Sequence, residues 1–153
     1  MINCGEPDVR RFVIKLQHEH NRLRETVKLR IQDNSIRLRL TRTEVERLND
    51  DGDVTATASF PGGSSLRYAV RRSAGARKLA ARFDAAGITV TIPAHTVRDW
   101  AETEQVSIEG DETLEGSNTL AILIEKDFAC LKPREGDDES DMFPHPQDGR
   151  ESC

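Results

Sequence analysis

The chain has 153 residues, of which 36% are hydrophobic and 32% carry a charge, and its net charge is -5 at pH 7. This composition is typical of one water-soluble domain and argues against a general polyanion binder. No apolar run approaches the roughly 18 residues of a membrane-spanning helix, and the N-terminus lacks a signal-peptide pattern, so we expect a cytoplasmic protein that does not contact a membrane. Three cysteines, Cys4, Cys130 and Cys153, are too few and too far apart for a disulfide framework.

Residues 1–27 show no strand-like alternation and have no counterpart later in the chain. We predict that they form an N-terminal arm outside the native protein, with the true start at Val27, because one valine codon is an alternative bacterial start codon. The body of the protein is then residues 28–127. An irregular C-terminal tail, residues 128–153, follows it and is rich in acidic residues and proline.

Apolar residues in the body alternate with polar ones in short runs, which is the pattern of half-buried strands. The runs are Leu29/Ile31, Ile36/Leu38/Leu40, Val54/Ala56/Ala58, Leu66/Tyr68/Val70, Ala81/Phe83 and Ile88/Val90/Ile92. A continuous apolar run at 119–124, TLAILI, predicts a central strand, and PGGSS at 61–65 predicts a hairpin loop. Most of the body is therefore expected to be antiparallel sheet.

Two stretches break this alternation and predict short helices over residues 41–50 and 93–102. In the first, Thr41 and Glu44 have the spacing of a capping box, and in the second, Pro93 suits the first helical position. Each helix buries only one i, i+3 pair, so both helices are expected to lie on a sheet. These pairs are Val45 with Leu48 and Val97 with Trp100.

Shifting the chain against itself by 52 residues superposes the two halves of the body. The shift places Leu29 on Ala81, Ile36 on Ile88, Val45 on Val97, Leu48 on Trp100, Val54 on Val106, Ala56 on Ile108, Tyr68 on Leu120 and Val70 on Ile122. One pair fails, because Leu66 falls on Asn118. We predict an α+β fold of two duplicated ββαββ units, residues 28–79 and 80–127, mostly antiparallel, which pack as a pseudo-dimeric barrel or sandwich around one core.

The second unit carries a resemblance. Its segments ITVTIPAHTVRDWAETEQVSIEG and TLAILIEKDF resemble the hairpin-helix-hairpin half of the AbrB/MazE-type swapped-hairpin barrels. In those barrels a strand that ends in Ile-Pro runs into one short helix. Many of them are DNA-binding transcription factors, but likeness of architecture does not carry that function across.

A second resemblance covers about residues 28–153. The segments KLRIQDNSIRLRLT, LIEKDFACL and ESDMFPHP, with a terminal cysteine, are similar to a small bacterial family whose function is uncharacterised. The resemblance implies no activity, and it implies a start near Lys28, where members of the family begin. The chain has His145 where the family pattern has asparagine, which argues against a common role for a histidine at that position.

The first predicted hairpin places basic residues opposite one another. A two-residue turn at 33–34 fixes a register with one apolar face, and on the other face Lys28 lies opposite Arg39 and Arg30 opposite Arg37. We call these four residues the basic hairpin face. Like charges in this arrangement need an acceptor, which is a phosphate or carboxylate of a partner, or acidic residues of the chain itself.

The two repeats differ in charge. Residues 28–79 carry 11 basic and 6 acidic side chains, whereas residues 80–127 carry 3 and 10, so the second repeat can neutralise the first. A second basic run, Arg71, Arg72, Arg77 and Lys78, either extends the basic hairpin face or forms a solvated linker. The leading hypothesis is a non-catalytic binding module, a monomer or homodimer, whose basic hairpin face binds an acidic protein or a nucleic acid.

The tail supports an alternative function, because it brings soft and hard metal ligands together in a short length of chain. The candidate ligands are Cys130, Asp138, Asp141, His145 and Cys153. Two thiolates, an imidazole and a carboxylate suit tetrahedral zinc, although the spacing matches no known zinc motif. The structural alternatives are that Cys130 is a small buried apolar residue and that the acidic residues only solubilise the tail.

Catalytic motifs are missing from the sequence. There is no phosphate-binding GxxxxGK or GxGxxG, no GxSxG and no HExxH. An enzyme would have to use Cys130 as its nucleophile, and no base is placed beside it in the sequence.

Overall fold

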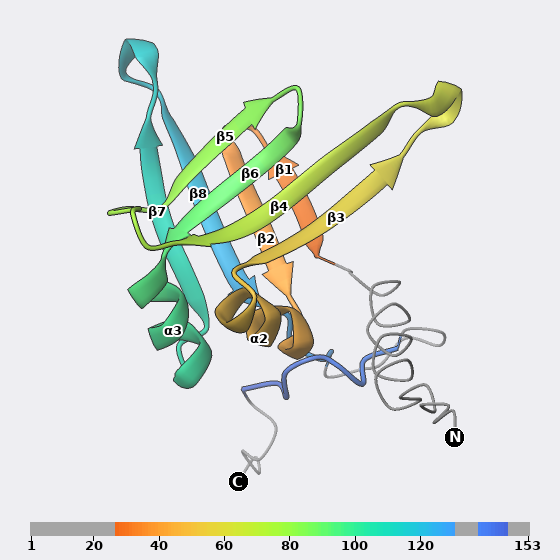
Figure 1. Ribbon diagram of the computed structural model, residues 1–153, viewed down its shortest axis with the longest axis vertical. Coiled ribbons are helices and arrows are strands. Elements are labelled where there is room, and N and C mark those ends of the chain that lie inside the picture. Colours follow the sequence, from red (N-terminus) through yellow and green to blue (C-terminus); the bar gives the residue numbers. More distant parts are fainter. Residues whose placement is uncertain (1–26, 131–137, 147–153) are drawn as a thin grey trace, which may run out of the picture.

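The computed structural model describes residues 27–130 and 138–146, which form two four-stranded sheets with two helices at one end (Figure 1). The strands are β1 (Lys28–Gln32), β2 (Ser35–Leu40), β3 (Asp53–Ser59), β4 (Ser65–Ser73), β5 (Ala80–Asp84), β6 (Gly87–Pro93), β7 (Ser107–Thr113) and β8 (Thr119–Lys126). The helices are α2 (Arg42–Asp50) and α3 (Ala94–Glu102), and short 3-10 turns are η2 (Pro61–Gly63) and η3 (Glu115–Ser117). The predicted arm, residues 1–26, lies outside the described residues.

Each sheet contains one hairpin from each repeat. Sheet A has the order β1-β2-β8-β7 and sheet B the order β3-β4-β6-β5. Antiparallel hairpins form the two sides of each sheet, and a parallel pairing joins them in the middle, β2 with β8 and β4 with β6. The predicted α+β fold of two ββαββ units is therefore confirmed, with mixed sheets. Of the two arrangements that the sequence left open, the closed barrel is wrong, because the sheets remain separate.

One hydrophobic core joins the two sheets and both helices. Its fully buried members come from both sheets and both helices: Leu38, Leu40, Leu48, Val54, Val70, Val90, Ile92, Val97, Trp100, Ile122 and Ile124. Since neither repeat contributes a whole sheet, neither has a complete core of its own. Val27 also belongs to this core, and its carbonyl accepts a hydrogen bond from the Tyr68 hydroxyl at 3.0 Å.

The helices follow the predicted local signals. Thr41 caps α2, and its side chain and that of Glu44 bond each other's backbone N–H groups, so the predicted capping box is confirmed. Pro93 lies one residue earlier than expected, at the N-cap of α3. The buried apolar residues are the predicted pairs, Val45 with Leu48 in α2 and Val97 with Trp100 in α3.

The duplication holds, but the single shift of 52 residues is wrong beyond the helices. Between α3 and β7 the chain has two more residues than between α2 and β3, so the second hairpins correspond with a shift of 54. Ile108 is then the counterpart of Val54, and each is buried in the core. Leu66, which had no apolar match at 52, now corresponds to Leu120. The glycines of the two turns also coincide, with φ of 82° at Gly62 and 76° at Gly116.

The strand over residues 119–124 is central, as predicted, because β8 lies between β2 and β7. Beyond β8, the Asp127 N–H donates to the Leu40 carbonyl at 2.8 Å, which continues the parallel pairing of β8 with β2. The described residues include no helix that is both long and apolar enough to cross a membrane.

Candidate functional site

The basic hairpin face forms in the predicted register. The Cα partners in β1 and β2 include Lys28 with Arg39 and Arg30 with Arg37, around the two-residue turn. All four side chains belong to the outer face of sheet A, because the alternate residues Leu38 and Leu40 point into the core. The local sequence therefore defined both the turn and the position of these charges.

Three of these four cations have carboxylate partners within the chain. Glu125 on β8 accepts from both Arg37, with an Nη2–Oε2 distance of 2.6 Å, and Arg39, with an Nε–Oε2 distance of 3.2 Å. The Lys28 Nζ lies 2.7 Å from an Asp127 carboxylate oxygen. Arg30 instead donates to the Gln32 side-chain oxygen at 2.7 Å. Acidic residues at the end of the second repeat thus neutralise much of the basic hairpin face.

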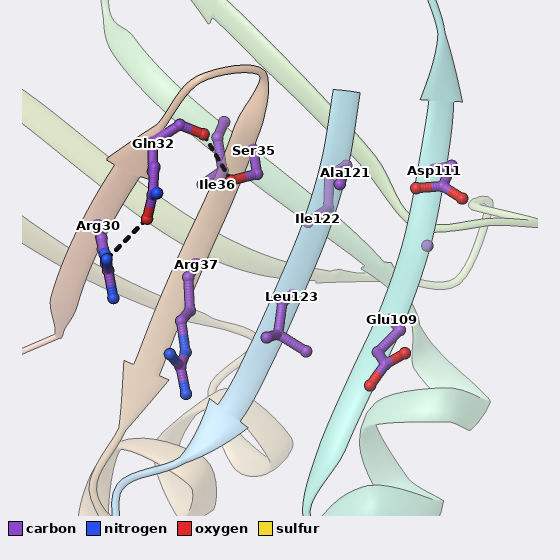
Figure 2. A pocket seen from close by; sticks show the side chains of 11 residues that line it. Arg30, Gln32, Ser35, Ile36, Arg37, Glu109, Asp111, Ala121, Ile122 and Leu123 are labelled. Carbon is purple, nitrogen blue, oxygen red and sulfur yellow. Dashed lines mark hydrogen bonds between the residues drawn. The ribbon is translucent and has the colours of Figure 1, made fainter. Parts of the chain in front are cut away.

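A groove of about 570 Å³ crosses the outer face of sheet A (Figure 2). Arg30 and Arg37 form one wall, on β1 and β2, and Glu109 and Asp111 on β7 form the opposite wall. The apolar side chains of Ala121 and Leu123 on β8 lie between the walls. We call this feature the sheet A groove.

The register explains why the charges separate. Arg37 is the Cα partner of Leu123, which in turn is the partner of Glu109, so one row runs from cation through apolar residue to anion. The Arg37 side chain is 33% exposed even with Glu125 bound, and it stays accessible to a ligand. Glu109 is exposed, and its carboxylate accepts a 3.2 Å hydrogen bond from the Ser107 hydroxyl.

The acidic wall was missed from the sequence. Glu109 and Asp111 alternate with buried or half-buried residues of β7, a period-two signal that marks them as outward-facing. That signal does not reveal which other strands lie beside β7. Only the parallel pairing of β2 with β8, which is distant in sequence, brings the acidic wall opposite Arg37. The second basic run does not extend this face, because Arg71 lies on β4 in sheet B.

Residues 138–146 of the tail fold back against the start of α2 (Figure 1). The Asp141 carbonyl accepts from the Arg42 N–H at 3.0 Å, and its side chain accepts from the Thr43 N–H at 3.2 Å and the Thr43 hydroxyl at 2.7 Å. Asp141 therefore supplements the capping box by satisfying two further N–H groups of the first helical turn.

A short parallel bridge anchors this segment next to the core. Phe143 bridges Phe128, and their ring centroids are 6.0 Å apart. The Phe143 ring also lies 5.3 Å from the Nζ of Lys126, which is only 6% exposed and donates to the Thr103 carbonyl at 2.6 Å. Burial lowers the pKa of Lys126 below its ordinary value, and Glu104 partly opposes that shift.

The predicted metal ligands are spread over this segment. Cys130 is exposed and its N–H donates to Glu139, Asp138 accepts from Ser140, Asp141 caps α2, and His145 lies near the end of the described segment. Within residues 27–130 and 138–146, no group of three His, Cys, Asp or Glu side chains is placed to hold a metal. Cys153 lies outside the described residues, so metal binding by the tail stays a prediction.

Asp141→Ala is expected to lower the free energy of unfolding by about 1–2 kcal/mol, because it removes acceptors from the first turn of α2. Urea unfolding followed by circular dichroism measures the change. Asp138→Ala is the matched control, since its carboxylate bonds the neighbouring Ser140, and we expect about 0.5 kcal/mol or less. Equal effects of the two substitutions would show that the Asp141 contacts do not stabilise α2.

No curated protein and no solved structure matches the chain. One family model matches residues 27–147, which is most of the chain and includes both repeats and the tail segment that caps α2. The chain therefore belongs to the family of unknown function DUF7009.

Proposed function

We propose that this protein is a non-catalytic binding module that holds an extended segment of a partner protein in the sheet A groove. One observation carries the proposal: the groove has a cationic wall and an acidic wall on either side of apolar side chains. In an extended peptide, successive side chains point in opposite directions. A segment in which acidic and basic residues alternate would therefore present its acidic side chains to Arg30 and Arg37 and its basic side chains to Glu109 and Asp111.

The combination of a cationic and an acidic wall also disfavours a nucleic acid as the ligand. Duplex DNA carries one negative charge per about 1.7 Å of helix axis, so its phosphates would lie against Glu109 and Asp111 as well as against the arginines. Glu125 also reduces the positive charge available to a polyanion, because it binds both Arg37 and Arg39. A ligand that carries both acidic and basic groups would pair with both walls. Its carboxylates would form the charge-assisted hydrogen bonds that arginine makes with carboxylate.

Binding of a fluorescently labelled octapeptide of alternating Glu and Lys, measured by fluorescence anisotropy at low salt, tests the proposal. We expect Arg30→Glu with Arg37→Glu to weaken its binding by tenfold or more, because two attractive contacts become repulsive. Glu109→Lys is expected to weaken the alternating peptide while strengthening binding of an all-Glu peptide. The single variant Arg30→Glu can be compared with Arg98→Glu, which makes the same charge change at an exposed position of α3 and should leave binding within about twofold.

Two results would contradict the proposal. One is equal binding of the alternating peptide by the parent protein and the double variant. The other is a DNA duplex that binds more tightly than the peptide and competes with it. Circular dichroism melting curves establish that each variant is folded, and Arg39 remains as a partner for Glu125 when Arg37 is replaced.

A further inference from the structure

A second groove, of about 370 Å³, lies on the outer face of sheet B at the position that the duplication makes equivalent to the sheet A groove. We call it the sheet B groove. Its lining residues are Arg67, Ala69, Arg71, Arg82, Asp84, Ala86, Ile88, Thr89 and Thr91. Arg82 is the counterpart of Arg30, and Thr89 is the counterpart of Arg37. The two grooves therefore share a backbone frame but differ in chemistry.

Cations and hydroxyl groups converge in the sheet B groove. On β4, Arg67 and Arg71 flank Ala69, which is only 5% exposed and forms a small floor between them. Ala69 is the Cα partner of Thr89, and Arg71 is the partner of Thr91 on the central strand β6. Side chains at these positions point to the same face of the sheet, because they share rows of the register.

The two β4 arginines lack the compensation found in sheet A. In sheet A the position equivalent to Arg71 is Glu125, which binds two arginines. Over the described ranges 27–130 and 138–146, no carboxylate lies within 4.0 Å of Arg67 or Arg71, although Asp53 is the cross-strand partner of Arg71. The sheet B groove is therefore positively charged where the sheet A groove is balanced.

The third arginine, Arg82, is paired with a carboxylate of the groove itself. Arg82 forms an ion pair of 2.6 Å with Asp84, whose carboxylate also accepts from the Ala86 N–H at 2.8 Å. The hydrogen bond from Ala86, and after it that from Arg82, lower the pKa of Asp84 below its ordinary value. On β3, the Thr55 hydroxyl oxygen is buried next to Ala69 in the register and has no hydrogen-bond partner within the part of the chain that the structure describes.

We propose that the sheet B groove binds the phosphate group of a small phosphate monoester, with Arg67 and Arg71 as the principal contacts and Thr89 and Thr91 as hydroxyl donors. Guanidinium groups match the geometry of phosphate oxygens and bind them with two parallel hydrogen bonds. Hydroxyl groups donate to the remaining oxygens. The neutral floor at Ala69 lets the oxyanion approach the sheet between the two arginines. This site lies on the other sheet and does not depend on the function proposed for sheet A.

A small ligand fits the groove better than a continuous polyanion. Asp53, on the edge strand β3, ends the register row that contains Arg71. Asp84, on the opposite edge strand β5, ends the row that contains Arg67. A chain of phosphates crossing the sheet would meet both carboxylates, whereas one phosphate group over Ala69 lies between Arg67 and Arg71 and beside Thr89.

Isothermal titration with O-phosphoserine, and separately with inorganic phosphate and with serine, tests the proposal at constant ionic strength. We expect both phosphate compounds to bind with a dissociation constant on the order of 1 mM or tighter and serine not to bind. Arg67→Gln with Arg71→Gln should weaken phosphoserine at least tenfold. The matched control, Arg77→Gln with Arg98→Gln, removes the same charge at two exposed positions outside both grooves and should change the affinity by less than about twofold.

A second variant guards against a loss of folding. Thr89→Val with Thr91→Val keeps the shape and the strand preference of both residues and is expected to weaken phosphoserine several-fold. The proposal is overturned if phosphoserine does not bind the parent protein, or if folded variants at Arg67 and Arg71 bind it unchanged. It is also overturned if a DNA duplex binds through these arginines while phosphoserine does not compete, since the site would then be a nucleic-acid contact.

Discussion

Gly87→Ala is expected to lower the free energy of unfolding by about 3–5 kcal/mol, through a steric clash and backbone strain together. Gly87 begins β6 with φ of 107°, and a Cβ atom there would lie 2.0 Å from the carbonyl oxygen of Arg67. That oxygen belongs to the backbone of β4, which pairs with β6 along its length. Relief of the clash would require the two central strands of sheet B to separate, so the strain cannot be absorbed by one side chain.

Gly62→Ala is the matched control, because Gly62 also has a positive φ, of 82°, but has no heavy atom within 4 Å of the added Cβ. Only the strain of the left-handed backbone remains, about 1–2 kcal/mol. Urea unfolding of both variants, with the slope of the transition compared between them, measures the difference. A loss at Gly87 no greater than that at Gly62 would mean that β4 and β6 are not packed at the distance described.

Trp100→Ala is expected to lower the free energy of unfolding by about 3–5 kcal/mol, because it leaves a cavity where both helices meet the sheets. Trp100 is 0% exposed and is the largest fully buried side chain among the described residues. Its indole N–H donates to the Val106 carbonyl at 3.2 Å, which fixes the connection between α3 and β7. The loss should therefore affect the core and the path of the chain into the second hairpin.

Two variants separate these contributions, and the same urea titration measures them. Trp100→Phe keeps an aromatic ring and removes the indole N–H. Because the Val106 carbonyl still accepts from the Lys126 N–H at 3.0 Å, we expect a loss of unfolding free energy smaller than that of Trp100→Ala. Phe60→Ala removes an aromatic ring that is 53% exposed and should cost about 1 kcal/mol or less. A loss at Trp100 similar to that at Phe60 would contradict the burial on which the prediction rests.

Local features of this fold were predictable because they depend on neighbouring residues. The capping box of Thr41 and Glu44 and the register of the first hairpin both follow from spacings of a few residues. The shift of the second hairpins was not predictable in the same way. Two extra residues after α3 preserve the alternation of β7, so a shift of 52 still placed apolar residues on apolar residues. Only the mismatch at Leu66 indicated the insertion.

The candidate sites were predictable only in part, for the same reason. The positions of Arg30 and Arg37 follow from their own hairpin, but their environment depends on which strand lies next to β2. The parallel neighbour β8 supplies Glu125, and a parallel pairing leaves no turn signal in the sequence. The sheet B groove depends in the same way on the pairing of β4 with β6. Charge totals for each repeat indicated that compensation was available, without indicating which arginines would receive it.

The exchange of hairpins sets the order in which the sheets can assemble during synthesis. All four strands of sheet B lie within residues 53–93, whereas sheet A combines the first and the last hairpins of the body. Arg39 and its partner Glu125 are 86 residues apart, a stretch that takes a ribosome about 4–17 s to translate. During that interval the first hairpin has no β8 beside it, and its apolar side chains are available to chaperones or to a neighbouring nascent chain. Sheet A can therefore be completed only after β8 has been synthesised, whereas sheet B needs no residue beyond Pro93.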